Sequence, residues 1–312
     1  MIRVDLITGF LGSGKTTFLK QYAQYLLRQG LKIGILENDY GAVNVDMLLL
    51  HELEGERCGL DMVAGACDAD CHKRRFKTKL IAMGMSNYDR VLIEPSGVFD
   101  VDEFFDVLYE EPLDRWYEIG SVIAVVDANL EDGLSDSADY LLASQLANAG
   151  TVVLSKTQLA SPEEIDATVA HMETALRRVQ CGKQLRERLL AKDWCALEDA
   201  DFARVMHSGY DSRSFVKRGT TDDSGFRSLY FMNRSFAAAE LRQKAQAVFD
   251  DPRCGRVFRV KGFVREGEAW LEFNATRQTA HVRPVAAGQD IVIVIGEQVK
   301  EEAVKTIFER KP

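Results

Sequence analysis

The chain has 312 residues and a net charge of −9 at pH 7, from 39 Lys and Arg against 48 Asp and Glu. This acidic balance argues against nucleic acid as the main partner, because a phosphate backbone requires a basic protein face. Hydrophobic residues make up 46% of the chain, and no apolar run reaches transmembrane length. The N-terminus is predicted to be a strand rather than a signal peptide. We therefore expect a cytoplasmic protein with no membrane partner.

The first predicted element is a strand over residues 3–8, which leads into the phosphate-binding pattern Gly-x-x-x-x-Gly-Lys-Ser/Thr at residues 9–16. In this pattern, glycines let backbone N–H groups converge on phosphate oxygens, the lysine reaches the β- and γ-phosphates, and the hydroxyl holds Mg²⁺. The helix that follows would point its positive N-terminus at the same anion. The predicted nucleotide-binding residues here are Gly9, Gly12, Ser13, Gly14, Lys15, Thr16 and Thr17.

Short apolar strands alternate with helical segments through the first two-thirds of the chain. Helical segments include 19–29 and 140–149, and further strands are predicted at 32–36, 90–93, 121–126 and 151–154. Continuous apolar strands separated by helices predict an α/β fold, a doubly wound and mostly parallel sheet of the P-loop NTPase type. Ligands of such sheets bind at the carboxyl ends of the strands.

Acidic residues follow two of these strands. Asp39 and Asp46 come after the second strand, where either would position an attacking water, unless they only form turns and caps. Glu94 ends the strand at 90–93 and would hold Mg²⁺, the alternative being a plain turn or helix acid. Gly97 can bring its N–H close to a γ-phosphate, an interaction that ends when the nucleotide is hydrolysed. The predicted catalytic residues are therefore Lys15, Thr16, Asp39, Asp46 and Glu94, with Thr16 and Glu94 as Mg²⁺ ligands.

The pattern changes after a polar segment at 208–226, which we interpret as a linker between a nucleotide-binding domain at 1–207 and a second domain at 227–312. The second domain has hairpins and is predicted to be a smaller α+β unit. Its expected strands are 228–236, 256–264, 269–273, 280–285 and 291–295, with helices at 239–249 and 300–310.

These motifs together resemble the CobW-type P-loop GTPases, a metallochaperone family related to the GTPases that insert nickel into urease and hydrogenase. The resemblance spans essentially the whole chain and rests on residues 8–17, on Asn-Asp-Tyr-Gly at 38–41 with Asp46, on Glu-Pro-Ser-Gly at 94–97, and on residues 259–263 with Trp270. It implies GTP hydrolysis linked to metal delivery, cobalamin metabolism or nitrile hydratase maturation. The second domain would then be the family's C-terminal domain.

The metal motif departs from this family. The resemblance calls for Gly-Cys-x-Cys-Cys, whereas residues 65–72 read Gly-Ala-Cys-Asp-Ala-Asp-Cys-His. Cys67 and Cys71 would share a face of a helix, and two thiolates with His72 suit Zn²⁺ or a related transition metal. The alternative is two incidental cysteines in a polar loop. The six cysteines of the chain are expected to be thiols or ligands rather than disulfides, and Cys58 is a further candidate ligand.

The base-reading element also departs from the family. GTPases of this class carry Asn/Thr-Lys-x-Asp, whereas residues 155–158 read Ser-Lys-Thr-Gln. Lys156 can still pack along the base. Gln158 offers one acceptor oxygen and a donor amide in place of a carboxylate, so a charge-assisted contact with guanine becomes a neutral one. We expect GTP to bind, with ATP competing better than in relatives that carry Asp.

The sequence thus predicts a slow, Mg²⁺-dependent GTPase that acts as a metallochaperone or metal-insertion accessory protein. Its expected partners are GTP, with ATP as a weaker ligand, a transition metal ion and a client metalloprotein, and a nucleotide-dependent homodimer is a further expectation. Two alternatives stay open: a P-loop kinase or ligase acting on a small molecule, and a nucleotide-gated interaction module that has lost metal binding.

Overall fold

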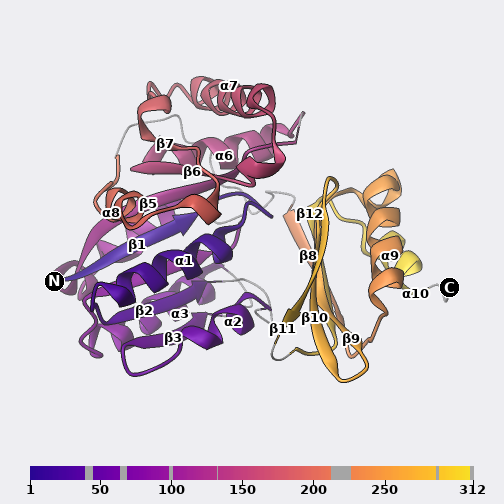
Figure 1. Cartoon of the computed structure of the whole chain (residues 1–312), viewed down its shortest axis with the longest axis horizontal. Helices are drawn as coiled ribbons and strands as arrows, with labels where there is room; N and C mark the ends of the chain where they lie inside the picture. Colours follow the sequence, from indigo (N-terminus) through magenta and orange to yellow (C-terminus); the bar gives the residue numbers. More distant parts are fainter. Residues whose placement is uncertain are drawn as a thin grey trace. The chain divides into compact units, whose positions relative to one another are not determined.

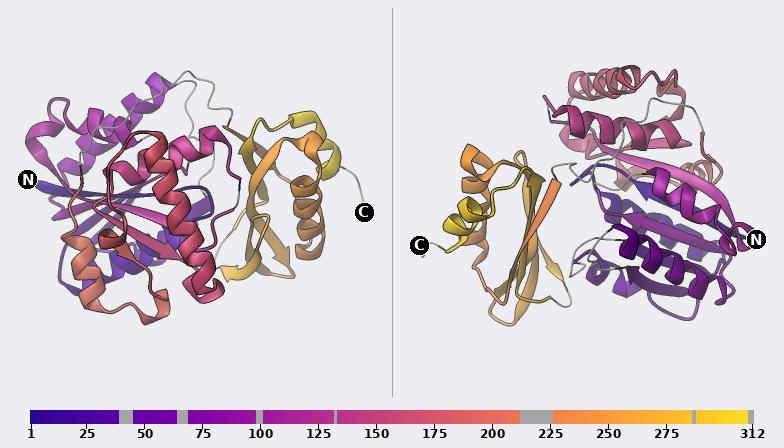
Figure 2. Two further views of the ribbon diagram at one scale, coloured as in Figure 1. Left: turned by 90° about the horizontal axis from the view of Figure 1, so that it is seen from above. Right: turned by 180° about the vertical axis from the view of Figure 1, so that it is seen from behind.

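The computed structural model describes residues 1–38, 45–63, 69–97, 101–131, 133–211, 226–285 and 288–309, without the side chains of residues 45, 46, 69, 70 and 103. The chain divides into two compact units, Met1–Arg218 and Gly219–Pro312. The first unit is a sheet covered by helices on both faces, and the second is a sheet with helices on one face (Figures 1 and 2). Within the described residues, no helix is both long and apolar enough to cross a membrane.

In the first unit, strands and helices alternate along the chain. The strands are β1 (Ile2–Thr8), β2 (Ile33–Asn38), β3 (Cys58–Val63), β4 (Arg90–Pro95), β5 (Tyr117–Asp127), β6 (Thr151–Ser155) and β7 (Leu189–Leu190). The α-helices are α1 (Lys15–Arg28), α2 (Val45–Leu50), α3 (Ala69–Gly84), α4 (Val101–Leu108), α5 (Leu113–Trp116), α6 (Asp136–Asn148), α7 (Pro162–Arg178) and α8 (Asp199–Met206). Short 3₁₀ helices are η1 (His51–Leu53), η2 (Thr157–Leu159), η3 (Arg186–Arg188) and η4 (Trp194–Ala196).

The strands of the first unit form one parallel sheet in the order β3-β2-β4-β1-β5-β6-β7, as far as the described residues go. The predicted doubly wound α/β fold is confirmed. β3 and β7, the two edge strands, were not predicted from the sequence. Because all strands run in parallel, the segments that follow β1, β2, β4 and β6 emerge at one edge of the sheet.

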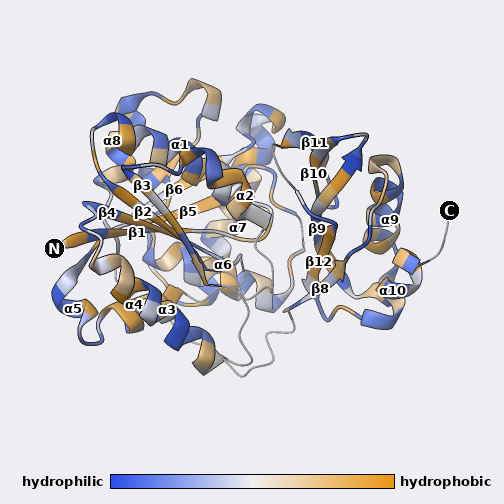
Figure 3. Ribbon diagram, turned by 90° about the horizontal axis from the view of Figure 1, so that it is seen from below, coloured by the Kyte–Doolittle hydropathy of each residue, from blue (hydrophilic) through white to orange (hydrophobic). Residues whose placement is uncertain are grey.

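Alternate residues of the central strands pack into two separate cores. Ile7, Ile35 and Leu92 face α1 and α8, whereas Leu6, Leu36 and Ile93 face the helices α3 to α7. Figure 3 shows hydrophobic residues along the central strands and mixed colouring on the helices around them. This pattern follows from strands buried on both faces, and it fixes the face to which each side chain at the end of a strand points.

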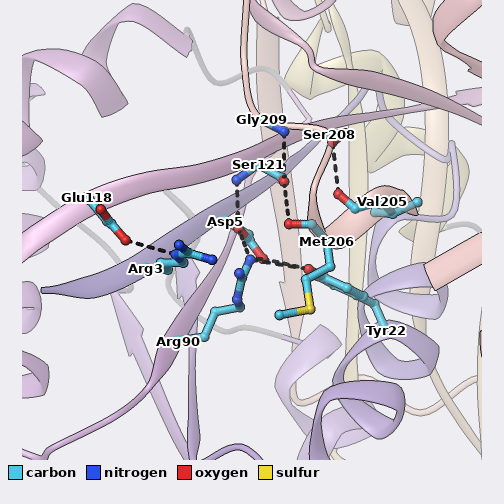
Figure 4. Close-up of polar contacts among 10 residues, drawn as sticks. All are labelled: Arg3, Asp5, Tyr22, Arg90, Glu118, Ser121, Val205, Met206, Ser208 and Gly209. Atoms are coloured by element: carbon cyan, nitrogen blue, oxygen red, sulfur yellow. Dashed lines mark hydrogen bonds and ion pairs between the residues drawn. The ribbon is translucent and has the colours of Figure 1, made fainter. Parts of the chain in front are cut away.

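A buried polar network ties together the elements that carry the phosphate loop. Asp5 of β1 accepts hydrogen bonds from the Arg90 guanidinium of β4 (2.6 Å), the Tyr22 hydroxyl of α1 (2.8 Å) and the Ser121 amide of β5 (2.7 Å; Figure 4). Asp5 and Arg90 are 0% and 2% exposed. The network lies in the middle of β1 and joins it to its two neighbouring strands and to α1.

The second unit contains β8 (Phe226–Met232), β9 (Arg256–Glu266), β10 (Ala269–Ala275), β11 (Ala280–Val285) and β12 (Ile291–Glu297), with α9 (Ala238–Asp250), η5 (Pro252–Cys254) and α10 (Glu301–Glu309). The strands pair antiparallel in the order β11-β10-β9-β12-β8. The helices pack on one face through a core that includes Leu241, Phe249, Val260 and Phe308. The predicted second α+β unit with hairpins is confirmed.

The segment predicted as a linker begins with residues that hydrogen-bond to the first unit. Gly209 accepts from the Val122 amide (2.9 Å), and the Asp211 amide donates to the Asn148 carbonyl (3.0 Å). Residues 212–225 lie outside the described part of the chain. The division at 207 and 226 stays a prediction.

Candidate functional site

The phosphate loop joins β1 to α1, and its three glycines have backbone conformations that other residues rarely adopt. Gly9 has φ +148°, Gly12 has φ +76° and Gly14 has φ +94°. A Cβ at Gly9 would lie 2.1 Å from the carbonyl oxygen of Val125, and one at Gly14 would lie 3.2 Å from the indole ring of Trp194. Glycine is therefore required at Gly9 by both conformation and space, which leaves the loop backbone close to the sheet.

Lys15 is the first residue of α1, and its side chain folds back over the loop. The ammonium group donates to the carbonyl oxygen of Gly9 (3.0 Å) and lies 3.5 Å from that of Phe10. Lys15 is only 6% exposed. The structure thus places a buried cation inside the loop, at the N-terminus of α1, where the helix dipole also favours an anion.

Thr16 and Glu94 meet at the end of the sheet, although they are far apart in sequence. The Thr16 hydroxyl donates to Glu94 Oε1 (2.8 Å), and Glu94 is 4% exposed. Glu37 of β2 pairs in register with Glu94 and is 3% exposed, so its side chain lies on the same face of the sheet. The Thr16 hydroxyl, the Glu94 carboxyl group and the buried carboxyl group of Glu37 on the neighbouring strand are oxygen donors of the kind that Mg²⁺ prefers. The sequence analysis assigned Glu94 but not Glu37.

Gly97 packs directly on the phosphate loop. A Cβ at this position would lie 2.8 Å from the backbone nitrogen of Leu11 and 3.0 Å from its Cα. One residue earlier, the Ser96 amide donates to the Asn38 carbonyl at the end of β2 (2.8 Å). The segment after β4 therefore lies beside both the loop and the end of β2, and the role of Gly97 near a γ-phosphate stays a prediction.

Lys156, which was assigned to the nucleobase, follows β6 in a left-handed conformation with φ +56°. Its ammonium forms an ion pair with the carboxylate of Asp127 at the end of β5. Gln158 lies in η2 and is exposed. The structure thus brings Lys156 to the same sheet edge as the phosphate loop, and the role of Gln158 in base selection stays a prediction.

Trp194 packs against the phosphate loop and was not predicted from the sequence to lie there. Its indole N–H donates to the Leu154 carbonyl of β6 (2.9 Å), and its ring lies 5.5 Å from that of Phe18, centroid to centroid. The ring also lies against Gly14. Trp194 therefore links the start of α1 to the end of β6, the strand that leads into the predicted base-reading segment.

The remaining predicted site residues are only partly within the described chain. Asp39 and Cys67 lie outside the described residues, as does the side chain of Asp46. Cys71 is half-buried and His72 is fully buried in the first turn of α3. In the described part of the chain, no three His, Cys, Asp or Glu side chains are grouped to hold a metal ion. The zinc site stays a prediction.

Comparison with known proteins agrees with this geometry. Residues 3–186 match the family model of the CobW/HypB/UreG nucleotide-binding domain. The chain is 31% identical over 172 residues to zinc chaperone YjiA of Escherichia coli (strain K12). The aligned region covers 52% of this chain and 52% of YjiA. It is 28% identical over 168 residues to zinc chaperone YeiR of the same organism, covering 54% of this chain and 50% of that one.

A third relative matches a larger share of the chain. Zinc-regulated GTPase metalloprotein activator 1 of Dictyostelium discoideum is 25% identical over 309 residues, covering 83% of this chain and 62% of that one. The chain spans about half the length of the two bacterial relatives that it matches. The family model covers more than half of this chain, and its phosphate loop, Glu94 and Gly97 meet at one edge of the matched domain. The chain therefore belongs to the CobW/HypB/UreG family and carries that family's nucleotide-binding domain.

Proposed function

We propose that this chain is a slow GTPase that acts as a metallochaperone, in which the bound nucleotide controls the transfer of zinc or a related divalent metal to a client protein. The observation that carries the proposal is the hydrogen bond from the Thr16 hydroxyl to the Glu94 carboxyl group. This hydrogen bond joins the phosphate loop to β4, the strand that leads into Gly97. The names of the relatives, zinc chaperones and a zinc-regulated GTPase, support zinc as the cargo.

The residues at this edge can bind a triphosphate and its metal ion. The Lys15 ammonium is placed to exchange the carbonyls of Gly9 and Phe10 for phosphate oxygens. Thr16 and Glu94 would hold Mg²⁺, which would neutralise phosphate charge during transfer. We assign positioning of the attacking water to Asp39 or Asp46, on the basis of their place after β2.

The phosphate site is tested by Lys15→Ala, with Lys20→Ala as the matched control on the same helix. Lys20 forms a surface ion pair with Glu52 (2.8 Å) and lies outside the loop. Lys15→Ala should weaken binding of a GTP analogue by about 2–4 kcal/mol, as expected for a charge-assisted contact left unpaired. Isothermal titration calorimetry measures this loss. Equal affinities of Lys15→Ala and Lys20→Ala would refute nucleotide binding at this loop.

The metal site is tested by zinc titration of the untagged protein. Cys67→Ser/Cys71→Ser should remove most of the affinity, whereas Cys195→Ser, at an exposed cysteine outside the motif, should not. Because the ligand thiols must lose their protons, zinc affinity should fall as the pH falls. If the double variant binds zinc like the parent, the ligands lie elsewhere.

We propose that the protein works in the cytoplasm, which the free thiols of Cys58, Cys71, Cys181, Cys195 and Cys254 support. We also propose that GTP is preferred to ATP and that two copies associate when nucleotide is bound. Gel filtration coupled to light scattering, with and without a GTP analogue, tests the association.

A further inference from the structure

Gly97 is held from two sides by groups outside its own segment. Its backbone packs on Leu11 of the phosphate loop, where a Cβ would meet the Leu11 nitrogen at 2.8 Å. In addition, its carbonyl accepts a hydrogen bond from the side-chain amide of Gln145 (3.3 Å). Gln145 belongs to α6, and 48 positions separate it from Gly97.

The setting of Gln145 is unusual for a polar side chain. It is 1% exposed, on the helix that contributes Leu142, Ala143 and Leu146 to the core. Its Oε1 atom makes no hydrogen bond within the described residues. A half-satisfied buried amide costs stability, and that cost is offset here by the hydrogen bond that the amide donates to the carbonyl of buried Gly97. The amide therefore holds the Gly97 carbonyl in addition to packing in the core.

Two hydrogen bonds enclose the peptide group between Ser96 and Gly97. The Ser96 amide is fixed by the Asn38 carbonyl (2.8 Å), and the Gly97 carbonyl is fixed by Gln145. The N–H of Gly97 lies between these two anchors. With both flanking peptide groups held, the direction of this N–H is set before any ligand arrives, which lowers the cost of binding.

We propose that Gln145 is a positioning residue for the γ-phosphate: it holds the Gly97 carbonyl and so orients the Gly97 N–H toward the triphosphate. This inference rests on the proposed nucleotide-binding function. A diphosphate lacks the γ-phosphate and so does not reach Gly97. Gln145 therefore affects the ratio of triphosphate to diphosphate affinity, and leaves the interactions of the phosphate loop itself unchanged.

The test compares Gln145→Met with Ser144→Ala. Methionine keeps the length of the side chain but has no N–H to donate. Ser144 is the matched control, because it is buried on the same helix and its hydroxyl bonds Leu141 instead (2.9 Å). Dissociation constants for GDP and a non-hydrolysable GTP analogue are measured by calorimetry, together with the melting temperature.

Gln145→Met should lower the preference for the GTP analogue over GDP about two- to tenfold, the value of one neutral hydrogen bond. Its GDP affinity should stay at the parent value, and Ser144→Ala should keep the parent preference. Gln145→Glu serves as a second variant if Gln145→Met does not fold. Its ionised carboxylate cannot donate, so the preference should again fall, and it should recover at lower pH as the carboxyl is protonated.

Two results would overturn the inference while leaving the proposed function standing. The first is an unchanged preference in a folded Gln145→Met or ionised Gln145→Glu protein. The second is an equal loss of affinity for GDP and the analogue with a lowered melting temperature, which indicates packing alone. A parent protein that binds neither nucleotide would instead refute the proposed function, and the inference with it.

Discussion

Removing the Arg90 guanidinium is expected to destabilise the first unit strongly. Arg90 Nη1 lies 2.6 Å and 2.5 Å from the two carboxylate oxygens of Asp5, and neither residue is more than 2% exposed. Arg90→Met would leave a buried carboxylate with two neutral donors, the Tyr22 hydroxyl and the Ser121 amide. Breaking a buried ion pair by removing one partner costs about 3–5 kcal/mol, and we expect a loss of this size near neutral pH.

The same substitution should make stability depend on pH in a defined direction. Burial raises the pKa of Asp5 above its usual value, and Arg90, Tyr22 and Ser121 each oppose that rise. Without Arg90 the pKa of Asp5 in the folded state rises further, whereas in the unfolded state it stays near 3.8. Between these two values the folded state retains a proton that the unfolded state releases. The variant therefore loses up to about 1.4 kcal/mol per pH unit as the pH rises through that window.

The assay is urea unfolding followed by circular dichroism, from acidic to neutral pH. Arg3→Met is the control, because Arg3 pairs with Glu118 at the surface (2.8 Å, with side chains 50% and 45% exposed) and should lose less than about 1 kcal/mol. Asp5→Asn/Arg90→Met should recover part of the loss, since it removes the uncompensated charge. A loss below about 1 kcal/mol for Arg90→Met, or one that does not grow with pH, would refute this reasoning.

Three further predictions concern single side chains. Gln158→Asp should raise the selectivity for GTP over ATP by roughly 1.5–3 kcal/mol, which is about ten- to a hundredfold. The measurement is the ratio of the ATP and GTP dissociation constants for the parent and the variant. An unchanged ratio would show that Gln158 does not read the base. Burial raises the pKa of the Cys58 thiol to about 11, so iodoacetamide at pH ~8 should label exposed Cys195 long before Cys58 in peptide mass spectra. Lys183→Met should lower the free energy of unfolding by about 1.5–3 kcal/mol, as measured by urea unfolding. The reason is that the buried ammonium group of Lys183 donates a hydrogen bond to the Leu146 carbonyl (2.8 Å) at the end of α6. A loss indistinguishable from zero would contradict this role.

The sequence predicted the central strands because they are buried on both faces and therefore read as unbroken apolar runs. The edge strands lack this signal. In β3, Gly59 and Asp61 interrupt the apolar pattern, and only the first and last residues of the strand, Cys58 and Val63, are buried. β7 consists of two residues, Leu189 and Leu190, which is too short for any periodicity. In the second unit, the hairpins and their alternating pattern were enough to predict each of the described strands.

The candidate site also contains a part that was predictable from local sequence and a part that depends on tertiary packing. Its contiguous part, the phosphate loop, was predictable because a single backbone turn demands glycines at fixed spacing. Glu37, Gln145 and Trp194 were not, because each reaches the site only through the register of the sheet or the packing of a helix. A signal for Glu37 was present, since a buried acidic residue directly after the apolar run Ile33–Leu36 needs a hydrogen-bonding or charged partner.

The register of the sheet gives a physical reason to expect coupling between nucleotide and metal. Asn38, the last residue of β2, pairs with Val63 at the end of β3 and with Pro95 at the end of β4. The segment that contains Cys67 follows Val63, and the segment that contains Gly97 follows Pro95. Neighbouring strands lie about 4.8 Å apart, so these two segments leave the sheet roughly 10 Å from each other.

Asn38 itself lies between them. Its side chain is 0% exposed, and neither its oxygen nor its nitrogen is hydrogen-bonded to the described residues. Its carbonyl already holds Ser96, one residue before Gly97. A γ-phosphate bound by the Gly97 N–H would therefore stabilise the neighbouring hydrogen bond from Ser96 to Asn38 at the end of β2, next to the start of the predicted metal segment. Coupling of this kind is reciprocal: zinc should tighten binding of a GTP analogue by the same factor by which the analogue tightens binding of zinc.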